Sequence, residues 1–339
     1  MQQQYFYSQN GLNWNQRFYL RLEAEVHPFD TPHLFRPLNK AYNGNTTFWS
    51  TPSPEPNLTD DFWQDVQSSV NPKIFNAAKN LAESVLNWQP NPKKLLFLSI
   101  LRAGVPITEW LCQMIPEAQG VALSLFVGIG IDRVALDAIK RDFPDRTPIF
   151  VDGWTGKGGV AREIKKLKIA PLAVLIDPWG WADFAGVQED IFCPSACFTG
   201  VATLGFSRTF FVDKNSIFSA YQFSKEFLQL KVVNSWKMAL FNDCQSNKID
   251  SDSLTLQNCN LKEFYTDTDL RVHSNEVCRA LINAAPESLL FADNRADAQK
   301  EFGLILKLGE QRGVEAKFNV QNLEELKTKV ACKLSTQKS

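Results

Sequence analysis

A chain of 339 residues exceeds the usual size of one domain, so its length predicts one large domain and a smaller one. Apolar residues make up 44% of the chain and aromatic residues 12%, which is enough for a packed core. The 37 acidic and 36 basic residues nearly cancel, so bulk charge does not indicate a nucleic acid, a membrane surface or an acidic partner.

The first 60 residues combine many aromatic and amide side chains with a Pro-rich stretch, STPSPEPNLTDD (50–61), and show no clear periodicity. A solvated, disordered tail would carry fewer aromatic residues, so we predict an N-terminal extension at 1–60 that lies on the core. The start of the chain has neither the basic nor the apolar region of a secretory signal, and the longest apolar run, LLFLSIL (95–101), is too short to cross a membrane. We therefore expect a cytoplasmic protein with no membrane partner.

A regular alternation of strands and helices is expected after a helical segment at 62–88, in which apolar residues recur at spacings of three and four. The expected strands are short and apolar: 94–101, 120–129, 147–152 and 170–177. The expected helices between them are 105–115, 133–143, which Asp132 can cap, and 159–168. This alternation indicates crossover connections, so we predict an α/β domain with a parallel sheet and helices on both faces.

The rest of the chain is expected to hold a cap, a linker and a second α/β unit. The stretch 177–211 is rich in glycine and aromatic residues, as expected for a segment that lines a pocket; 218–241 is predicted as a helix and 242–260 as polar linker. The last unit is expected to hold helix 275–285 after the cap Ser274, strand 288–293, helix 296–312, which stops at Gly313, strand 314–320 and helix 322–334. The predicted domains are thus 61–245, a linker at 246–265 and a small αβαβα domain at 266–339.

The stretch FVDGWTGKGG (150–159) ends a predicted strand with one acid and then opens into glycines. Such a strand, running into a helix N-terminus, forms an anion site, because backbone N–H groups point outward and the helix dipole adds positive potential. Neither the P-loop nor the dinucleotide-binding motif fits, since Gly159 stands where the P-loop needs lysine. The alternative is a turn that only reverses the chain, although Asp152, Thr155 and Lys157 are polar groups that such a turn does not need.

This stretch resembles the phosphoribosyl-diphosphate loop of type I phosphoribosyltransferases, in which acids hold the ribose hydroxyls and a glycine-rich turn holds the 5′-phosphate. The resemblance implies that Asp152 is a catalytic residue and a metal ligand. It implies that the phosphate is held by Thr155, Gly156, Lys157, Gly158 and Gly159. The chain departs from the family at Gly153, where many members carry a second acid.

A second match, LSILRAGVPI (98–107), resembles the pyrophosphate loop of the same family. Arg102 can donate two hydrogen bonds to diphosphate oxygens, and Ala103 and Gly104 bring backbone donors close. The alternative is a turn whose arginine faces water. Both loops follow strands of a parallel sheet, and open α/β sheets bind ligands at the carboxyl ends of their strands. The resemblance implies phosphoribosyl diphosphate as the small-molecule substrate, with Mg²⁺ bridging its diphosphate and ribose oxygens.

Over roughly residues 70–240 the chain resembles the StiP-like branch of this fold, which is associated with tellurite-type stress-response gene clusters. The resemblance rests on RAGVPI (102–107), GID (130–132), VDGWTGKGG (151–159), CPSACFTG (193–200) and SRT (207–209). Relatives tend to carry arginine before GID, where this chain has LFVGIGID (125–132). The resemblance implies an enzyme that transfers ribose phosphate to an unidentified acceptor, for which a nucleobase-like molecule is one candidate. The alternatives are a non-catalytic ribose-phosphate sensor and an RNA-binding adaptor with an inactive core.

Some members of this branch are labelled cysteine proteases, and such an enzyme needs a cysteine within reach of a histidine. The histidines, His27, His33 and His273, all lie outside the predicted core. Cys197 is the one candidate thiol, and a small buried residue beside the pocket is the favoured interpretation. The odd number of cysteines, seven, indicates reduced thiols, and Cys193 and Cys197 lack the partners of a zinc site.

The segment 277–320 resembles the Pelota-like RNA-binding domain, which is related to kink-turn-binding ribosomal proteins. The resemblance implies RNA as a partner, bound by a patch that includes Arg279, Arg295 and Lys300, together with Lys307 and Arg312. Residues 261–339 hold twelve basic and twelve acidic side chains, so no bulk positive field supports phosphate contacts. The alternative is a solvated helical face on an accessory domain.

Overall fold

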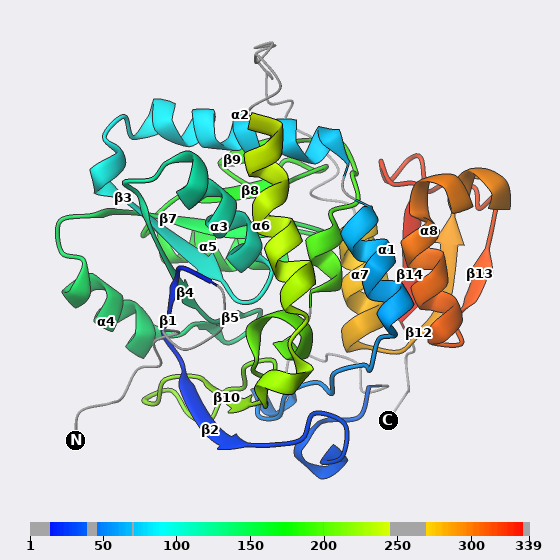
Figure 1. Cartoon of the computed structure of the whole chain (residues 1–339), viewed down its shortest axis with the longest axis horizontal. Helices are drawn as coiled ribbons and strands as arrows, with labels where there is room; N and C mark the ends of the chain where they lie inside the picture. The colour runs from blue at the N-terminus through cyan, green and yellow to red at the C-terminus, as the bar shows by residue number, and fades with distance from the viewer. Residues whose placement is uncertain (1–13, 39–45, 70, 199, 245–268, 335–339) are drawn as a thin grey trace.

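The computed structural model describes residues 14–38, 46–69, 71–198, 200–244 and 269–334 (Figure 1). A six-stranded sheet lies at the centre of the large domain, in the order β1-β4-β3-β7-β8-β9, and every neighbouring pair is parallel. Its strands are β1 (Arg17–Phe18), β3 (Leu95–Ile100), β4 (Gln119–Leu123), β7 (Thr147–Trp154), β8 (Leu172–Ile176) and β9 (Phe184–Val187). The predicted α/β class with a parallel sheet is confirmed.

Helices cover both faces of this sheet because its central strands are apolar on both sides. In β3, Leu95 and Phe97 belong to one hydrophobic cluster and Leu96 and Leu98 to another. Helices α2 (Pro72–Trp88) and α3 (Gly104–Met114) cover the first face, and α4 (Arg133–Asp142) and α5 (Gly159–Leu167) cover the second. Asp132 caps α4 as predicted, because its Oδ1 accepts a hydrogen bond from Ala135 N at 2.9 Å.

The described residues of the N-terminal extension, 14–38 and 46–60, lie on the large domain. Trp14, Phe18 and Leu20 are buried, and β1 extends the sheet beside β4. Strand β2 (Arg21–Glu25) pairs in parallel with β10 (Ser219–Gln222) below the domain in the view of Figure 1. The Pro-rich stretch then leads to α1 (Asp60–Ser68), whose N-cap is Thr59. The extension is therefore part of the domain and brings residues near 55 toward the main sheet.

Two predicted elements of the large domain are wrong in part. The predicted helix 218–241 begins as strand β10, and the helix, α6, spans Leu230–Cys244. β10 is held by β2, a partner almost 200 residues away that local periodicity cannot reveal. The predicted strand 120–129 ends with β4, because positive φ at Gly128 (88°) and Gly130 (102°) allows a hairpin between β5 (Leu125–Phe126) and β6 (Gly130–Ile131).

A small C-terminal unit with its own sheet is confirmed. Its elements are β11 (Leu270–Val272), α7 (Ser274–Asn283), β12 (Pro286–Phe291), α8 (Arg295–Gln311), β13 (Glu315–Lys317) and β14 (Val330–Leu334), and the sheet order is β11-β14-β12-β13. The predicted last helix, 322–334, is wrong: Val330–Leu334 pairs antiparallel with both β11 and β12. Val330, Ala331 and Cys332 are fully buried between these two partner strands, so tertiary pairing overrides the helical propensity of the stretch. The predicted linker at 246–265 lies outside the described residues.

No helix in the described parts of the chain has both the length and the apolar character needed to span a membrane.

Candidate functional site

The two loops singled out by the sequence lie side by side. β3 and β7 are neighbouring parallel strands, so the turns that follow Ile100 and Trp154 are at the same edge of the sheet. The contact is between main chains: a Cβ added to Gly104 would lie 2.3 Å from Val151 O, and one added to Gly153 would lie 3.2 Å from Ala103 O. The sheet therefore brings Arg102–Gly104 and Asp152–Gly159 together, as the sequence predicts for the carboxyl ends of parallel strands.

Asp152 lies near the end of β7 and is only 7% exposed. Its Oδ1 accepts a hydrogen bond from Gly153 N at 2.8 Å. Burial raises the pKa of the Asp152 carboxyl to about 7; the Gly153 hydrogen bond and the Arg279 charge oppose this, and Glu276 adds to it. Asp152 can therefore gain or lose a proton near neutral pH.

This pKa predicts a pH dependence of stability. The pKa of Asp152 is higher in the folded protein than in the unfolded chain, so protonation stabilises the fold: the contribution is complete below about pH 4 and is lost as the pH rises through about 7. Between pH 4 and pH 8, the free energy of unfolding should fall by about 2–4 kcal/mol more in the wild type than in Asp152→Asn. Urea denaturation at several pH values measures this difference, and parallel curves for the two proteins would contradict it. The pKa values of Asp132 and Asp190 are also raised, to about 6. Both residues are present in the two proteins, so their contributions cancel in the difference between the two curves.

The glycine-rich turn bends sharply just before the N-terminus of a helix. Gly156 (φ 51°) and Gly158 (φ 76°) adopt the left-handed conformation, and α5 begins at the next residue, Gly159. Thr155 Oγ1 donates to Asp177 Oδ1 at 2.6 Å, which ties the turn to the end of β8. Sequence reasoning missed Asp177 as the group that positions Thr155. Lys157 is half-buried in the middle of the turn.

Side chains from elsewhere cover this turn. A Cβ on Gly156 would lie 2.5 Å from Glu276 Cγ, and one on Gly158 would lie 2.3 Å from the Trp181 ring. Glu276 belongs to α7, and its Oε1 accepts a hydrogen bond from Trp154 Nε1 at 2.8 Å. A phosphate group at the turn would therefore compete with the Glu276 carboxylate. Sequence reasoning missed Glu276, because no motif links α7 to a loop more than 100 residues before it.

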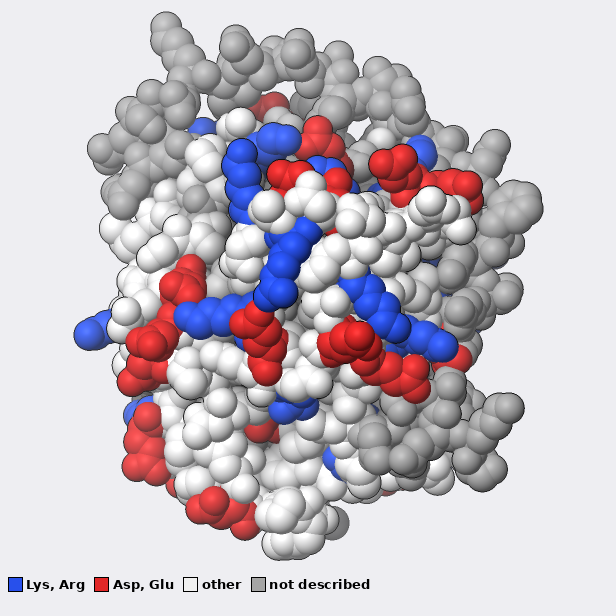
Figure 2. Space-filling model, turned by 90° about the vertical axis from the view of Figure 1, so that its right-hand side faces the viewer, with Lys and Arg blue, Asp and Glu red and all other residues white. Residues whose placement is uncertain are grey.

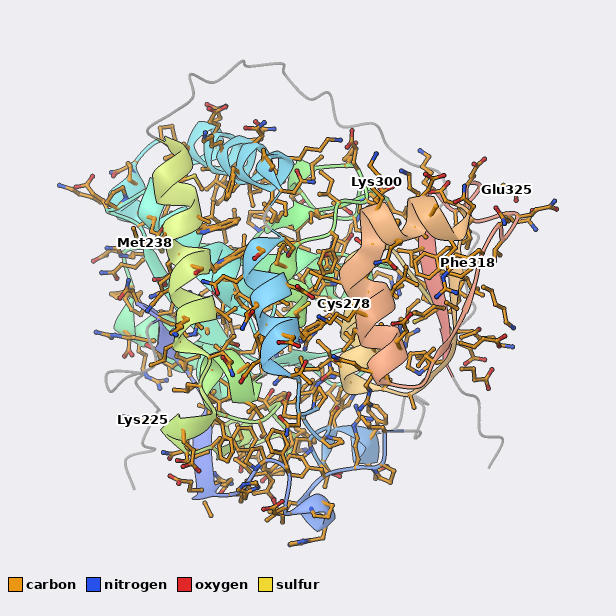
Figure 3. All side chains as sticks on the ribbon, turned by 45° about the vertical axis from the view of Figure 1, so that its right-hand side comes forward. Lys225, Met238, Cys278, Lys300, Phe318 and Glu325 are labelled. Carbon is orange, nitrogen blue, oxygen red and sulfur yellow. The ribbon has the colours of Figure 1, made fainter. Side chains whose placement is uncertain are left out.

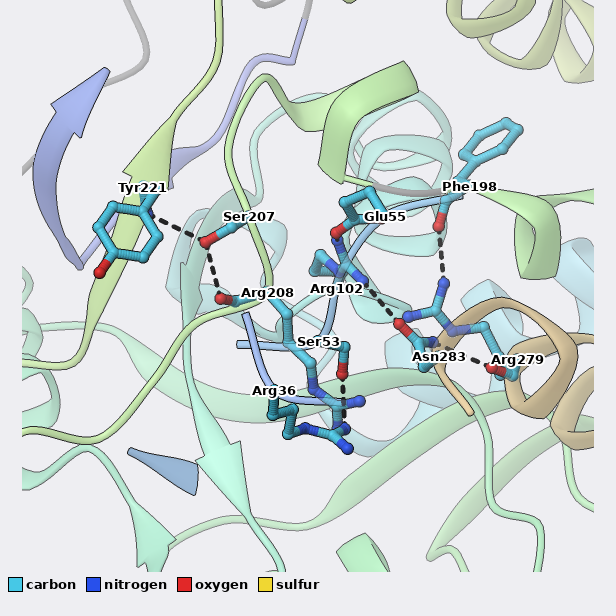
Figure 4. A network of polar contacts seen from close by, with 10 residues as sticks. All are labelled: Arg36, Ser53, Glu55, Arg102, Phe198, Ser207, Arg208, Tyr221, Arg279 and Asn283. Atoms are coloured by element: carbon cyan, nitrogen blue, oxygen red, sulfur yellow. Dashed lines mark hydrogen bonds and ion pairs between the residues drawn. The ribbon is translucent and has the colours of Figure 1, made fainter. Parts of the chain in front are cut away.

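Arg102 is buried and paired inside the protein (Figure 4). Its Nη1 lies 2.5 Å from Glu55 Oε1, and its Nη2 donates to Asn283 Oδ1 at 3.2 Å. The side chains of Arg102 and Glu55 are 4% and 0% exposed, so the alternative of an arginine that faces water is wrong. Glu55 comes from the N-terminal extension and Asn283 from α7, so parts of the chain on both sides of the main domain reach the pyrophosphate-type loop.

The residues predicted to bind RNA do not share one surface. Arg279 points into the protein, where its Nη1 donates to Phe198 O at 2.8 Å. Arg295 and Lys300 are exposed on α8, and Arg295 lies 3.7 Å from Glu310. On the face of the molecule in Figure 2, basic and acidic side chains alternate and do not gather into a basic patch. Lys300 lines a groove of about 1280 Å³ between α8, α1 and the segment 188–192, away from the two loops.

The described thiols do not form a protease dyad. Cys193 and Cys197 are buried, as predicted, and Cys197 Sγ lies 3.5 Å from Cys278 Sγ on the inner side of α7 (Figure 3). Burial raises the pKa of Cys193 to about 11 and lowers that of His273 to about 3. Neither ring nitrogen of His273 has a hydrogen-bond partner, and among the described residues no imidazole lies within hydrogen-bond distance of a thiol. These groups do not supply the thiolate and imidazolium of such an enzyme.

Comparisons with known proteins connect this chain to two kinds of relative. It is 24% identical over 275 residues to the cysteine protease StiP of Acinetobacter baylyi, covering 76% of this chain and 63% of that protein. It is 36% identical over 113 residues to the uracil phosphoribosyltransferase of Sinorhizobium medicae, and 33% identical over 112 residues to that of Legionella pneumophila. These two matches each cover 29% of this chain, and 52% and 50% of the relatives. The chain thus spans 50–63% of the length of these curated relatives.

Among solved structures, the chain resembles the HGPRT-ase from Leishmania tarentolae in complex with GMP, with 12% identity, a TM-score of 0.25, and coverage of 41% of this chain and 81% of that one. At this TM-score nothing about the site follows from the likeness. The family described as "Tellurite-like stress resistance cysteine protease StiP" matches residues 42–236, more than half of the 339 residues. The protein therefore belongs to this StiP family.

Proposed function

We propose that this protein binds phosphoribosyl diphosphate at the edge of the main sheet and transfers ribose phosphate to a nucleobase-like acceptor. The observation that carries the proposal is the convergence of two loops, Arg102–Gly104 after β3 and Asp152–Gly159 at the end of β7, on neighbouring parallel strands. The partial similarity to two uracil phosphoribosyltransferases supports it. In a stress-related family, such an activity would act on a nucleotide or a nucleotide precursor.

Each part of the proposed site has a chemical role. Arg102 and the Ala103–Gly104 backbone would hold the diphosphate, Asp152 the ribose hydroxyls, and Thr155–Gly159 the 5′-phosphate. Transfer develops positive charge at the anomeric carbon while diphosphate leaves, so the protein contributes positioning and stabilisation of the leaving charge.

Mg²⁺ fits the oxygen ligands of this site, since Asp152 supplies a carboxylate near the predicted diphosphate. Within the described residues, no cluster of three or more Asp, Glu, His or Cys side chains could hold a metal by itself. Asp152 would therefore hold Mg²⁺ together with oxygens of the diphosphate, and the ion would supply positive charge beside the leaving group.

A second candidate function is a non-catalytic sensor of ribose phosphates. The observations that favour it are the pairing of Arg102 with Glu55 and the cover of Glu276 and Trp181 over the glycine-rich turn. A sensor would bind phosphoribosyl diphosphate and release no diphosphate.

RNA binding by the C-terminal unit, as a Pelota-like domain, stays a prediction. Retention of RNA by the full chain, and its loss when Arg295 and Lys300 are both changed to Gln, would support it.

Titration calorimetry with phosphoribosyl diphosphate and Mg²⁺, followed by diphosphate-release assays over a panel of nucleobases, tests the proposal. Glu276→Gln should tighten binding about tenfold, because it removes a negative charge beside the 5′-phosphate and keeps an acceptor for Trp154 Nε1. The control is Glu301→Gln, an exposed residue on α8 that pairs with Lys329 and should bind like the wild type.

Gly158→Val tests the same turn with the opposite expectation, which is weaker binding of phosphoribosyl diphosphate. A side chain at Gly158 meets both a left-handed φ of 76° and the Trp181 ring, so the turn must distort and binding should weaken at least about tenfold. Wild-type affinity in a folded Gly158→Val protein would exclude this turn as the phosphate site. Binding without release over the whole panel would favour the sensor over the transferase.

A further inference from the structure

Arg102 is one of four arginines that lie close together, and we call Arg36, Arg102, Arg208 and Arg279 the arginine cluster (Figure 4). Arg36 comes from the N-terminal extension, Arg208 from the segment after the helical turn Gly200–Leu204, and Arg279 from α7. Burial lowers the pKa of Arg208 well below its usual value, and the charges of the other three arginines lower it further. Four separate parts of the chain therefore bring like charges to one place.

The positive charge of the cluster greatly exceeds the negative charge of the side chains that pair with it. Glu55 is the one carboxylate of the described residues that pairs with the cluster, through Arg102, and its Oε2 has no hydrogen-bond partner. Glu276 and Asp152 act electrostatically on Arg279 from the side of the glycine-rich turn. Burying several guanidinium groups with a single carboxylate destabilises a protein unless another anion compensates.

The donors of the cluster are also incompletely used. Arg36 donates to Ser53 Oγ at 2.5 Å and lies 4.0 Å from the centre of the Phe48 ring. Arg208 is half-buried and lies 5.0 Å from the centre of the Trp49 ring; its guanidinium makes no hydrogen bond or ion pair to any residue that the structure describes. A guanidinium offers five N–H donors in a planar arrangement that matches phosphate oxygens. The cluster thus keeps donors available for an anion of more than one charge.

We propose that the arginine cluster binds a diphosphate group. In the structure the Glu55 carboxylate occupies part of this site, and a bound diphosphate displaces it from Arg102. The inference rests on the proposed function where it places diphosphate at Arg102, and it adds Arg36, Arg208 and Arg279 as further ligands. It does not require ribose transfer. It also gives the N-terminal extension and the C-terminal unit a direct part in ligand binding.

Calorimetry and thermal unfolding of the full chain with inorganic diphosphate test this inference. Arg208→Gln should weaken diphosphate binding about tenfold or more, since one charge-assisted contact is lost. The same substitution should raise the Tm without ligand, because it removes a repulsive charge that has no partner among the described residues. The control is Arg21→Gln, an exposed arginine paired with Glu23, which should bind diphosphate like the wild type. A purely structural Arg208 would give a lower Tm and unchanged diphosphate binding, and this result would overturn the inference.

Glu55→Gln should act in the opposite direction. It removes the carboxylate that competes with the ligand, so diphosphate binding should tighten about tenfold, while the Tm without diphosphate should fall and recover on its addition. Unchanged diphosphate affinity in this variant would contradict the displacement.

Two further ligands separate this inference from the proposed function. If diphosphate binding depends on Arg208 and phosphoribosyl diphosphate does not bind, the cluster is a diphosphate site and the proposed transferase activity is excluded. If Arg208→Gln binds phosphoribosyl diphosphate as the wild type does, the result supports the two-loop site and overturns the inference that the arginine cluster binds diphosphate. Ribose 5-phosphate should bind equally well to the wild type and to Arg208→Gln, because it lacks the diphosphate; a loss in the variant would overturn the assignment of the cluster to diphosphate.

Discussion

Trp110→Ala is expected to lower the free energy of unfolding by about 3–5 kcal/mol, the range for removing a buried tryptophan from a core. Trp110 is fully buried on α3 and stacks on Trp236 of α6, with ring centres 3.7 Å apart and planes 11° apart. Its Nε1 donates to Trp236 O at 2.8 Å, and Phe75 of α2 packs on its ring. The substitution leaves a large cavity where three helices meet and an acceptor without its donor.

The matched control is Trp88→Ala, at the end of α2. Trp88 is 40% exposed and its ring centre lies 5.8 Å from that of Phe184, so its loss should cost no more than about 1–2 kcal/mol. Urea denaturation followed by circular dichroism measures both variants. Equal losses in the two variants would show that the stacked pair does not hold α3 and α6 together.

Gly104→Ala is expected to lower the free energy of unfolding by about 3 kcal/mol, at the upper end for overpacking. The new methyl group would lie 2.3 Å from Val151 O, and a backbone carbonyl in a central strand cannot rotate away as a side chain can. The start of α3 would therefore have to move away from β7, and with it Arg102. The site predicts that phosphoribosyl-diphosphate binding is lost together with stability.

Gly159→Ala is the control for this substitution. Its methyl group would lie 3.1 Å from Val127 Cγ2, the end of a side chain, at a helix position where alanine is favoured. The expected change in stability is within about 1 kcal/mol of zero. If Gly104→Ala is no less stable than Gly159→Ala, the two loops are not packed main chain against main chain.

The C-terminal unit is more than an accessory domain, because α7 reaches the candidate site at three positions. Glu276 covers the glycine-rich turn, Arg279 joins the arginine cluster, and Asn283 accepts a hydrogen bond from Arg102. Binding of the proposed ligand at the two loops would thus be coupled to the position of α7.

The apolar runs of the sequence were enough to place the central strands and the candidate loops. Buried strands such as Leu95–Ile100 and Leu172–Ile176 are recognisable because both faces of a parallel sheet are covered, and alternation with helices makes the sheet parallel. Parallel strands end at one edge, so the meeting of the loops after β3 and β7 could be predicted without coordinates. The cap at Asp132 followed from local chemistry in the same way.

Contacts between distant segments were decided by the tertiary structure alone. The pairing of Glu55 with Arg102, the cover of Glu276 over Gly156, and the strands β10 and β14 each join residues far apart in the chain. Local periodicity and motif spacing carry no information about such pairs, because a side chain or strand at one place is stabilised by a partner that other elements bring near. The sequence alone therefore determined the four central strands and the loops that follow them, and the three-dimensional fold added the edge strands β1 and β9 and determined what lies against the loops.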